Sequence, residues 1–357
     1  MKKTAILVAA LILIPALTLG SVLFLLHRAE TPEEESTVVE VSEEESSAPA
    51  VAASEDPGEG SSEEPYVTPD EYFEFVREGD YAYMIQVKDA TALTGRVVIP
   101  AEHEGKPVAV ISPGGFADCV GMTDLVIPEN VTVLFQESFK NCYSLKRVSL
   151  PASLKEIGYS AFENCVSLET VTVPENVTQI AHRAFAGCEK LKTLNITTDE
   201  LVTANSNAFT GCNALEYAEY GNCLYLGDAA NPYRLLVKAK NEAVAQVSVN
   251  ASAVAVAAFA FSGCASLTEL ELPEGVKTID MFAFTACSGL RSISIPQTVI
   301  NFRPSAFSGC ASLADIRYAG TAEQWSALAN GFTGDFAVYC SDGVIMPDGD
   351  IEVKTNR

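Results

Sequence analysis

Apolar side chains recur at fixed phases along most of the chain. In residues 144–165 they stand at Leu145, Val148 and Leu150, and the last two flank a polar residue, which is typical of a short β-strand. A proline follows this strand in most copies, and because proline has no N–H to donate, we expect each strand to end there. The same apolar phases return at Leu168, Val171 and Val173, at Leu267, Leu270 and Leu272, and at Leu290, Ile293 and Ile295.

A phenylalanine stands three residues before a cysteine eight times. The cysteines lie 23 residues apart, except for one spacing of 24 and one long gap from Cys212 to Cys264. A fixed period of about 20 to 50 residues predicts a solenoid, because each repeat buries its apolar face only against its neighbours. We expect the rings to stack and the cysteines to be small core residues rather than disulfides. The pairs are Phe116/Cys119, Phe139/Cys142, Phe162/Cys165, Phe185/Cys188, Phe209/Cys212, Phe261/Cys264, Phe284/Cys287 and Phe307/Cys310.

The repeat reads Leu-x-x-Val-x-Leu-Pro, then a linker, then Ile-x-x-x-Ala-Phe-x-x-Cys. It resembles the BspA-like, surface-antigen class of leucine-rich repeats over about residues 96–340. The resemblance implies a bacterial protein whose fold is a mainly β and irregular solenoid of short parallel strands, with a role in adhesion to host or neighbouring cells. Leucine-rich repeats carry many binding functions, so the resemblance names no ligand.

Segments of other composition interrupt and flank the repeats. We expect residues 66–95, rich in tyrosine and phenylalanine, to cap the first coil, because an open stack exposes its core. Residues 318–357 are expected to close the last coil with a helix in which Trp325 is a core plug, and to continue as a tail. The repeats occupy 96–212 and 247–317, and a strand-type insertion occupies 213–246.

The amino terminus predicts a membrane anchor. Residues 4–26 carry no charge, and this uncharged run is long enough for a membrane-crossing helix of about 20 residues. Lys2 and Lys3 favour the cytoplasmic side for the amino end. We therefore assign 1–28 to a single-pass anchor that leaves the repeats outside the cell. A secretory signal peptide cut within residues 16–21 is the alternative, and it predicts a secreted protein.

Charge narrows the partner classes. Residues 30–64 hold thirteen acidic residues and no Lys or Arg, so 29–65 is expected to be a disordered acidic linker. The formal net charge of −24 argues against nucleic acid, whose phosphates require clustered basic residues, and against anionic lipid head groups. Contact with the membrane is therefore expected through the amino-terminal helix only.

The sequence predicts no catalysis. Motifs such as Gly-x-Ser-x-Gly, His-Glu-x-x-His and the phosphate-binding loop are absent, and no Cys-x-x-Cys occurs. The three histidines, His27, His103 and His182, lie far along the sequence from the off-phase Cys223 and Cys340. We expect no cofactor, no metal site and no small-molecule substrate.

Binding is the function that remains, and two groups of residues are candidates for it. The insertion concentrates aromatic and basic side chains, and repeat insertions often lie on a binding face; the alternative is that its tyrosines cover a strand pair bridging a break in the stack. We expect a protein partner, either a host surface or matrix protein bound by an adhesin, or an envelope protein of the same cell organised by a scaffold or spacer. The candidates are Tyr217, Tyr220, Tyr225, Tyr233, Arg234 and Lys238 in the insertion, and Lys146, Arg291 and Arg317 along the exposed strand ladder.

Overall fold

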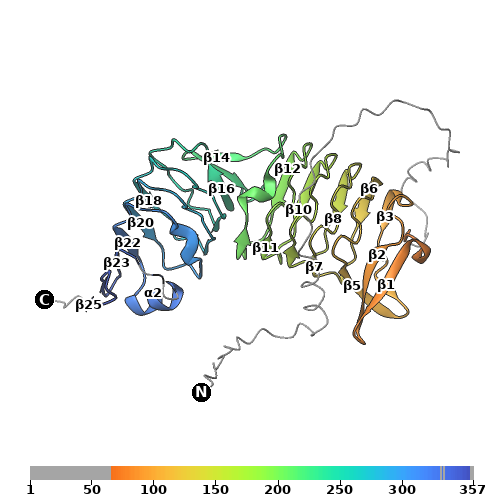
Figure 1. Ribbon diagram of the computed structural model, residues 1–357, viewed down its shortest axis with the longest axis horizontal. Helices are drawn as coiled ribbons and strands as arrows, with labels where there is room; N and C mark the ends of the chain where they lie inside the picture. The colour runs from red at the N-terminus through yellow and green to blue at the C-terminus, as the bar shows by residue number, and fades with distance from the viewer. Residues whose placement is uncertain (1–65, 330–331, 333, 354–357) are drawn as a thin grey trace, which may run out of the picture. The chain divides into compact units, whose positions relative to one another are not determined.

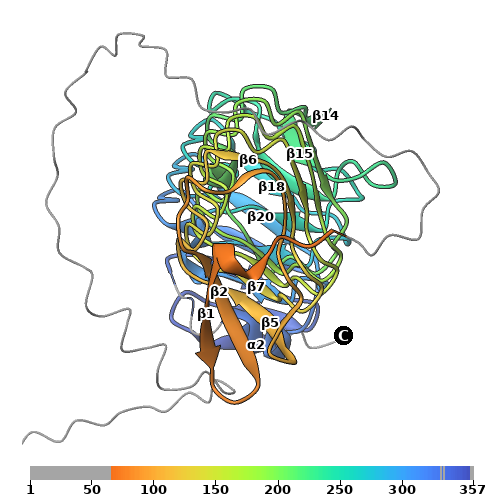
Figure 2. The same cartoon turned by 90° about the vertical axis from the view of Figure 1, so that its right-hand side faces the viewer.

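The described part of the chain is a β-solenoid. The computed structural model describes residues 66–329, 332 and 334–353, so the expected anchor 1–28 and linker 29–65 lie outside it. Equivalent residues of successive coils are 23 apart, as in the Asn164–Asn141 side-chain hydrogen bond of 2.9 Å. The predicted solenoid is confirmed here, and viewed along the stack its coils overlie one another (Figure 2). Within the described ranges, none of the helices has the length and apolar character of a bilayer span.

Sheets 1 and 2 form the N-terminal stack (Figure 1). Each coil contributes one short strand to each sheet, and neighbouring coils pair in parallel, with Ile157 opposite Ile180 in sheet 1. Sheet 1 contains β1 (Phe73–Glu78), β2 (Ala82–Val87), β4 (Glu102–His103), β5 (Lys106–Ile111), β7 (Val133–Leu134), β9 (Glu156–Ile157), β11 (Gln179–Ile180) and β13 (Thr203–Ala204). Sheet 2 contains β3 (Thr94–Val98), β6 (Gly121–Val126), β8 (Arg147–Ser149), β10 (Thr170–Val173) and β12 (Thr193–Ile196).

Sheets 3 and 4 form the C-terminal stack, and short helices lie among the coils. Sheet 3 contains β14 (Ala218–Tyr220), β15 (Cys223–Leu226), β16 (Leu235–Ala239), β17 (Ala255–Val256), β19 (Thr278–Ile279) and β21 (Asn301–Phe302). Sheet 4 contains β18 (Glu269–Glu271), β20 (Ser292–Ile295), β22 (Asp315–Tyr318), β23 (Ala337–Tyr339), β24 (Gly343–Ile345) and β25 (Ile351–Val353). The helices are η1 (Asp70–Tyr72), η2 (Ser206–Phe209), η3 (Pro304–Phe307) and α2 (Ala322–Ala329).

Proline ends the longer strands as the sequence predicts. β10 stops at Val173, directly before Pro174, and β20 stops at Ile295, directly before Pro296. Without an N–H the proline cannot extend the ladder, and its carbonyl instead accepts a turn hydrogen bond, as Pro174 does from Val177 at 3.2 Å. The chain therefore leaves sheets 2 and 4 at the same phase in successive coils.

The phenylalanine ladder and the buried cysteines are confirmed. Phe139 and Phe162 stack with ring centroids 5.3 Å apart, and Phe162 and Phe185 are 5.4 Å apart. The Cys165 thiol is fully buried and donates a hydrogen bond of 3.2 Å to the carbonyl of Phe139 in the preceding coil. The eight in-phase cysteines are free thiols, seven of them buried and Cys310 partly exposed. Within each stack, ring stacking and thiol hydrogen bonds to the preceding ladder phenylalanine thus join successive coils.

Strands β15 to β17 form a partition between two hydrophobic cores. Along β16, Leu235 and Val237 pack into the core of the N-terminal stack, whereas Leu236 packs into the core of the C-terminal stack. In β17, Ala255 and Val256 alternate in the same way. A strand that is buried on both faces is expected to be a nearly continuous apolar run. β16 begins with three apolar residues, Leu235, Leu236 and Val237.

The edge of β13 is capped mainly by side chains of sheet 3. The Asp280 carboxylate accepts hydrogen bonds from the backbone N–H groups of Ala204 at 2.9 Å and Met281 at 2.7 Å. The Thr278 hydroxyl donates to the Leu201 carbonyl at 2.5 Å. Both side chains are fully buried. Backbone N–H and C=O groups at the edge of the N-terminal stack thereby gain hydrogen-bond partners across the partition.

Aromatic residues close both ends of the described solenoid. Phe73 of β1 is buried against Phe116, the first ring of the ladder, with centroids 5.9 Å apart. At the other end Trp325 of α2 is 3% exposed and packs 5.5 Å from Phe302. The prediction of a helix carrying a buried Trp325 is confirmed. These aromatic rings shield the hydrophobic core at each end, where no further coil stacks within the described residues.

We predict that Cys165→Ala lowers the free energy of unfolding by about 1 to 3 kcal/mol, because it removes the hydrogen bond to Phe139 and leaves a void. Urea denaturation followed by circular dichroism measures the loss. Cys310→Ala is the matched control: its thiol makes the same bond, to Phe284 at 3.1 Å, but is partly exposed. If Cys310→Ala lowered the free energy of unfolding as much as Cys165→Ala or more, the importance given to burial of the thiol would be contradicted.

Because the carboxyl of Asp280 is buried, we predict that the stability of the fold depends on pH. Burial raises the pKa of its carboxyl in the folded protein above the ordinary 3.8, although its two N–H donors and the nearby Arg303 oppose the shift. Its favourable contribution is therefore fully present below about pH 4 and is lost as the pH rises through the raised folded pKa.

We expect the unfolding free energy of the wild-type protein minus that of Asp280→Asn to fall between pH 4 and 7. Denaturation curves of both proteins at successive pH values provide the test. Asp335→Asn, at an exposed carboxylate, serves as the control. A difference that rises or stays constant with pH would refute the assignment.

Candidate functional site

The insertion folds as a hairpin whose turn requires glycine. Tyr220 pairs with Cys223 across the two-residue turn Gly221-Asn222, and both turn residues have positive φ, 55° and 66°. A side chain on Gly221 would overlap the Ser248 carbonyl oxygen. Tight hairpin turns favour this conformation, and glycine adopts it without strain. The turn therefore sets the register of β14 against β15.

The hairpin divides the predicted tyrosine cluster between its two faces. We name Tyr220, Tyr225 and Tyr233 the aromatic face. Tyr225 is fully buried and its hydroxyl accepts a hydrogen bond of 3.1 Å from the Asn250 N–H. The half-buried Tyr233 meets Tyr225 and Tyr220 edge-on, at centroid distances of 5.5 and 5.9 Å, and Tyr220 is 45% exposed. Tyr225 lies inside the core and supports the outer two rings.

The opposite side of the hairpin, which we name the charged face, contains Tyr217, Glu219, Lys238 and Lys240. The Lys238 ammonium lies 5.5 Å from the centroid of the Tyr217 ring, a cation–π geometry. Lys240 forms an ion pair of 2.6 Å with Glu219. Burial raises the pKa of the Tyr217 hydroxyl, which therefore stays protonated at neutral pH. Among the described residues, Lys238 has no carboxylate partner.

Arg234 lies beneath the hairpin surface. Its side chain is 9% exposed and forms ion pairs with Asp199 and, at 3.3 Å, with Asp228. Burial lowers the pKa of the guanidinium, and its Nε has no hydrogen-bond partner among the described residues. Two carboxylates in contact with one buried charge offset its desolvation. In this arrangement Arg234 joins the residue 199 loop to the hairpin.

The ladder candidates lie apart from the hairpin. Lys146 precedes β8 in sheet 2, whereas Arg291 precedes β20 and Arg317 lies within β22, both in sheet 4. All three side chains are exposed, and none makes an ion pair with another described residue. The structure therefore places the nine candidates on the two hairpin faces, at the buried Arg234, and along sheets 2 and 4.

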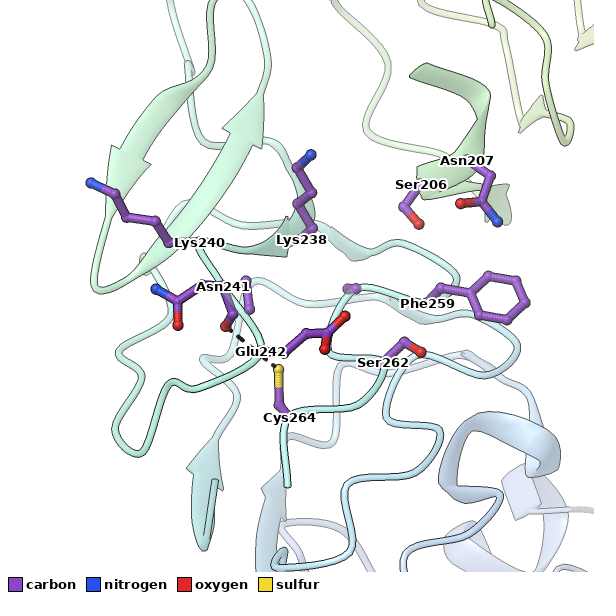
Figure 3. A pocket seen from close by; sticks show the side chains of 11 residues that line it. Ser206, Asn207, Lys238, Lys240, Asn241, Glu242, Phe259, Ser262 and Cys264 are labelled. Atoms are coloured by element: carbon purple, nitrogen blue, oxygen red, sulfur yellow. Dashed lines mark hydrogen bonds between the residues drawn. The ribbon is translucent and has the colours of Figure 1, made fainter. Parts of the chain in front are cut away.

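A polar cleft of about 470 Å³ opens beside the charged face, and Lys238 and Lys240 of that face also line it (Figure 3). One wall is formed by Ser206 and Asn207 of η2. The opposite wall contains Glu242 and Ser262, and Phe259 lies at one end. Burial, and secondarily the charge of Glu242, raise the pKa of the cleft-lining Cys264 thiol to about 11, which favours the protonated thiol at neutral pH.

The repeats match the description BspA type leucine rich repeat region, in six copies, over residues 109–231 and 240–329. The chain belongs to the BspA-type leucine-rich repeat family. The resemblance drawn from the Leu, Pro and Phe-Cys phases is confirmed to this extent. The matched segments include the hairpin strands β14 and β15 and the whole of η2.

Several solved structures are similar to this BspA-type chain. A leucine-rich repeat protein of T. pallidum is 22% identical, covering 70% of this chain and 81% of that chain, with a TM-score of 0.32. A leucine rich cell surface protein from Faecalibacterium prausnitzii is 24% identical, with coverages of 75% and 99% and a TM-score of 0.32. A leucine-rich repeat protein from Bacteroides ovatus is 21% identical, with coverages of 76% and 75% and a TM-score of 0.35. No curated protein sequence matches the chain.

Sequence reasoning named Lys238 but missed the other cleft residues, although the BspA-type repeat holds one signal. Phe259 and Phe282 stand two residues before a ladder phenylalanine, a phase that Glu137, Ser160 and Arg183 occupy in the N-terminal stack. All five have positive φ, 53° to 63°. That conformation is strained for a bulky aromatic residue. Two aromatic residues at this phase, Phe259 and Phe282, distinguish the coils that follow the hairpin from those of the N-terminal stack, and Phe259 lines the cleft.

Proposed function

We propose that this BspA-type chain is an extracytoplasmic binding protein of bacterial type whose partner is another protein. In this proposal residues 1–28 anchor it in the membrane, or are cleaved as a signal, and 29–65 hold the repeats away from the surface. The uncharged run and the acidic run of the sequence support that arrangement. The segment boundaries expected from the sequence, 66–95, 96–212, 213–246, 247–317 and 318–357, belong to the same proposal.

The aromatic face of the hairpin is the observation that carries the proposal. Tyr220 is exposed and is held edge-on to Tyr233, which rests in turn on the buried Tyr225. Tyrosines whose orientation is already fixed lose little side-chain entropy when they are covered, and tyrosine is enriched among residues that dominate binding energy. Lys238 adds an exposed charge on the other face of the same hairpin.

We expect Tyr220→Ser to reduce capture of the partner about tenfold or more, since loss of a central tyrosine removes on the order of 1.4 kcal/mol or more of binding free energy. The measurement is a proximity-labelling pull-down on intact cells, with the label fused to the carboxyl terminus of the full chain. Tyr143→Ser is the matched control, because Tyr143 is 44% exposed and lies in an ordinary repeat.

The captured proteins distinguish the two functional hypotheses. Host or matrix proteins that disappear in Tyr220→Ser would support adhesion. Envelope proteins of the same cell that disappear in the variant would support the scaffold. Capture that Tyr220→Ser and Tyr143→Ser leave equally unchanged would refute the hairpin as the contact, and cytoplasmic partners would refute the topology.

A further inference from the structure

We propose that the cleft beside the charged face is a subsite for a cationic side chain, arginine or lysine, presented by a partner protein. That a partner protein presents the side chain rests on the proposed binding function. The inference adds that the site recognises a positively charged group. Its volume of about 470 Å³ falls within the usual range of about 300 to 1,000 Å³ for ligand pockets.

Four hydrogen-bonding side chains converge on the cleft without partners of their own. Within the described residues, Ser206, Asn207, Ser262 and Glu242 form no side-chain hydrogen bond or ion pair. In Figure 3 the Glu242 carboxylate and the Ser262 hydroxyl lie across the opening from Ser206 and Asn207. A carboxylate, two hydroxyls and an amide together provide several acceptor oxygens, which an ammonium or guanidinium group requires.

The carboxylate of Glu242 is held over the floor of the cleft. It lies over Gly263, close enough that a side chain there would meet its Cδ at 3.5 Å. Gly263 has a φ of 76°, so glycine is favoured at this point. Two basic residues also line the cleft: Lys240 is paired with Glu219, and the Lys238 ammonium points away from Glu242 and lies over the Tyr217 ring. Glu242 therefore forms no ion pair within the described residues, and its carboxylate is available to a ligand.

Phe259 provides an apolar wall suited to the stem of such a side chain. It stacks on Phe282 with centroids 5.3 Å apart and an interplanar angle of 22°. Its backbone φ of 63° is the conformation that this phase of the repeat also adopts in other coils, as at Glu137 and Arg183. Arginine and lysine bury an aliphatic stem while their charged head stays among polar groups. The net charge of −24 also favours the approach of cationic partners.

The test uses the full chain in lipid nanodiscs and two probes, Nα-acetyl-arginine amide and Nα-acetyl-citrulline amide, which has nearly the same shape without the charge. Binding is measured by ligand-observed saturation-transfer NMR. We expect saturable binding of the arginine probe that weakens as salt is added, and at least tenfold weaker binding of the citrulline probe.

Glu242→Gln should weaken binding of the arginine probe at least tenfold. Glu274→Gln, at an exposed glutamate of a regular repeat, should leave it unchanged and is the matched control. Because Glu242 is exposed, its conservative substitution should not affect folding, which circular dichroism checks. Equal binding of the two probes, no saturable binding, or no change in Glu242→Gln would each overturn the subsite.

This outcome is separable from that of the hairpin experiment. Tyr220 lies on the aromatic face and does not line the cleft. An arginine probe that binds through Glu242, together with unchanged partner capture in Tyr220→Ser, would refute the hairpin contact and leave the subsite standing. The opposite pair of results would refute the subsite alone.

Discussion

Successive coils are joined by a hydrogen bond from a cysteine thiol to the carbonyl of the preceding ladder phenylalanine. The bonds from Cys142, Cys165 and Cys188 are all 3.2 Å long and each spans 26 residues. The bond requires a protonated thiol, and burial, which raises the pKa of Cys165, keeps it so. Disulfide formation would consume the donor. Regular stacking of rings, strands and loops at a 23-residue period therefore depends on reduced, buried cysteines.

The most unusual features of the molecule occur where this stacking stops. Among the described residues no ring contact joins Phe209 to Phe261, and the hairpin strands fill the interval with a sheet buried on both faces. Between the two stacks strand pairing is reduced to isolated bridges, such as Asn205 with Ala258. The side chains of Asp280 and Thr278 satisfy further backbone groups at this edge, and Arg234 supports the adjoining loop. On the loop side the two stacks separate, and the polar cleft lies in that opening.

What the sequence reveals is mainly what repeats. The strand ends, the phenylalanine ladder and the buried cysteines follow from phases that recur many times, and Trp325 follows from the need to cover the last coil. The hairpin is harder, because only the register set by the Gly221-Asn222 turn places Tyr225 opposite Ala218, on the same face as Tyr220. Nothing local reveals that the Asp280 carboxylate binds the Ala204 N–H, 76 residues earlier. The cleft depends on contacts of this kind, which a one-dimensional pattern does not contain.

Recognition is proposed at the break rather than along the ladder because the repeat restrains the two places differently. A repeat restrains each phase, because the residue must suit the coil before and the coil after, and the outer row of strands is accordingly small and polar at Ser149, Thr172 and Ser294. Residues flanking the break, such as Ala258, contact the other stack on one side instead of a regular coil. They are free of part of that restraint, and it is there that Phe259 and the exposed Glu242 line one cleft. An exposed carboxylate and an aromatic ring beside one cleft can contact the charged head and the aliphatic stem of a single cationic side chain, which is why recognition is proposed at the break.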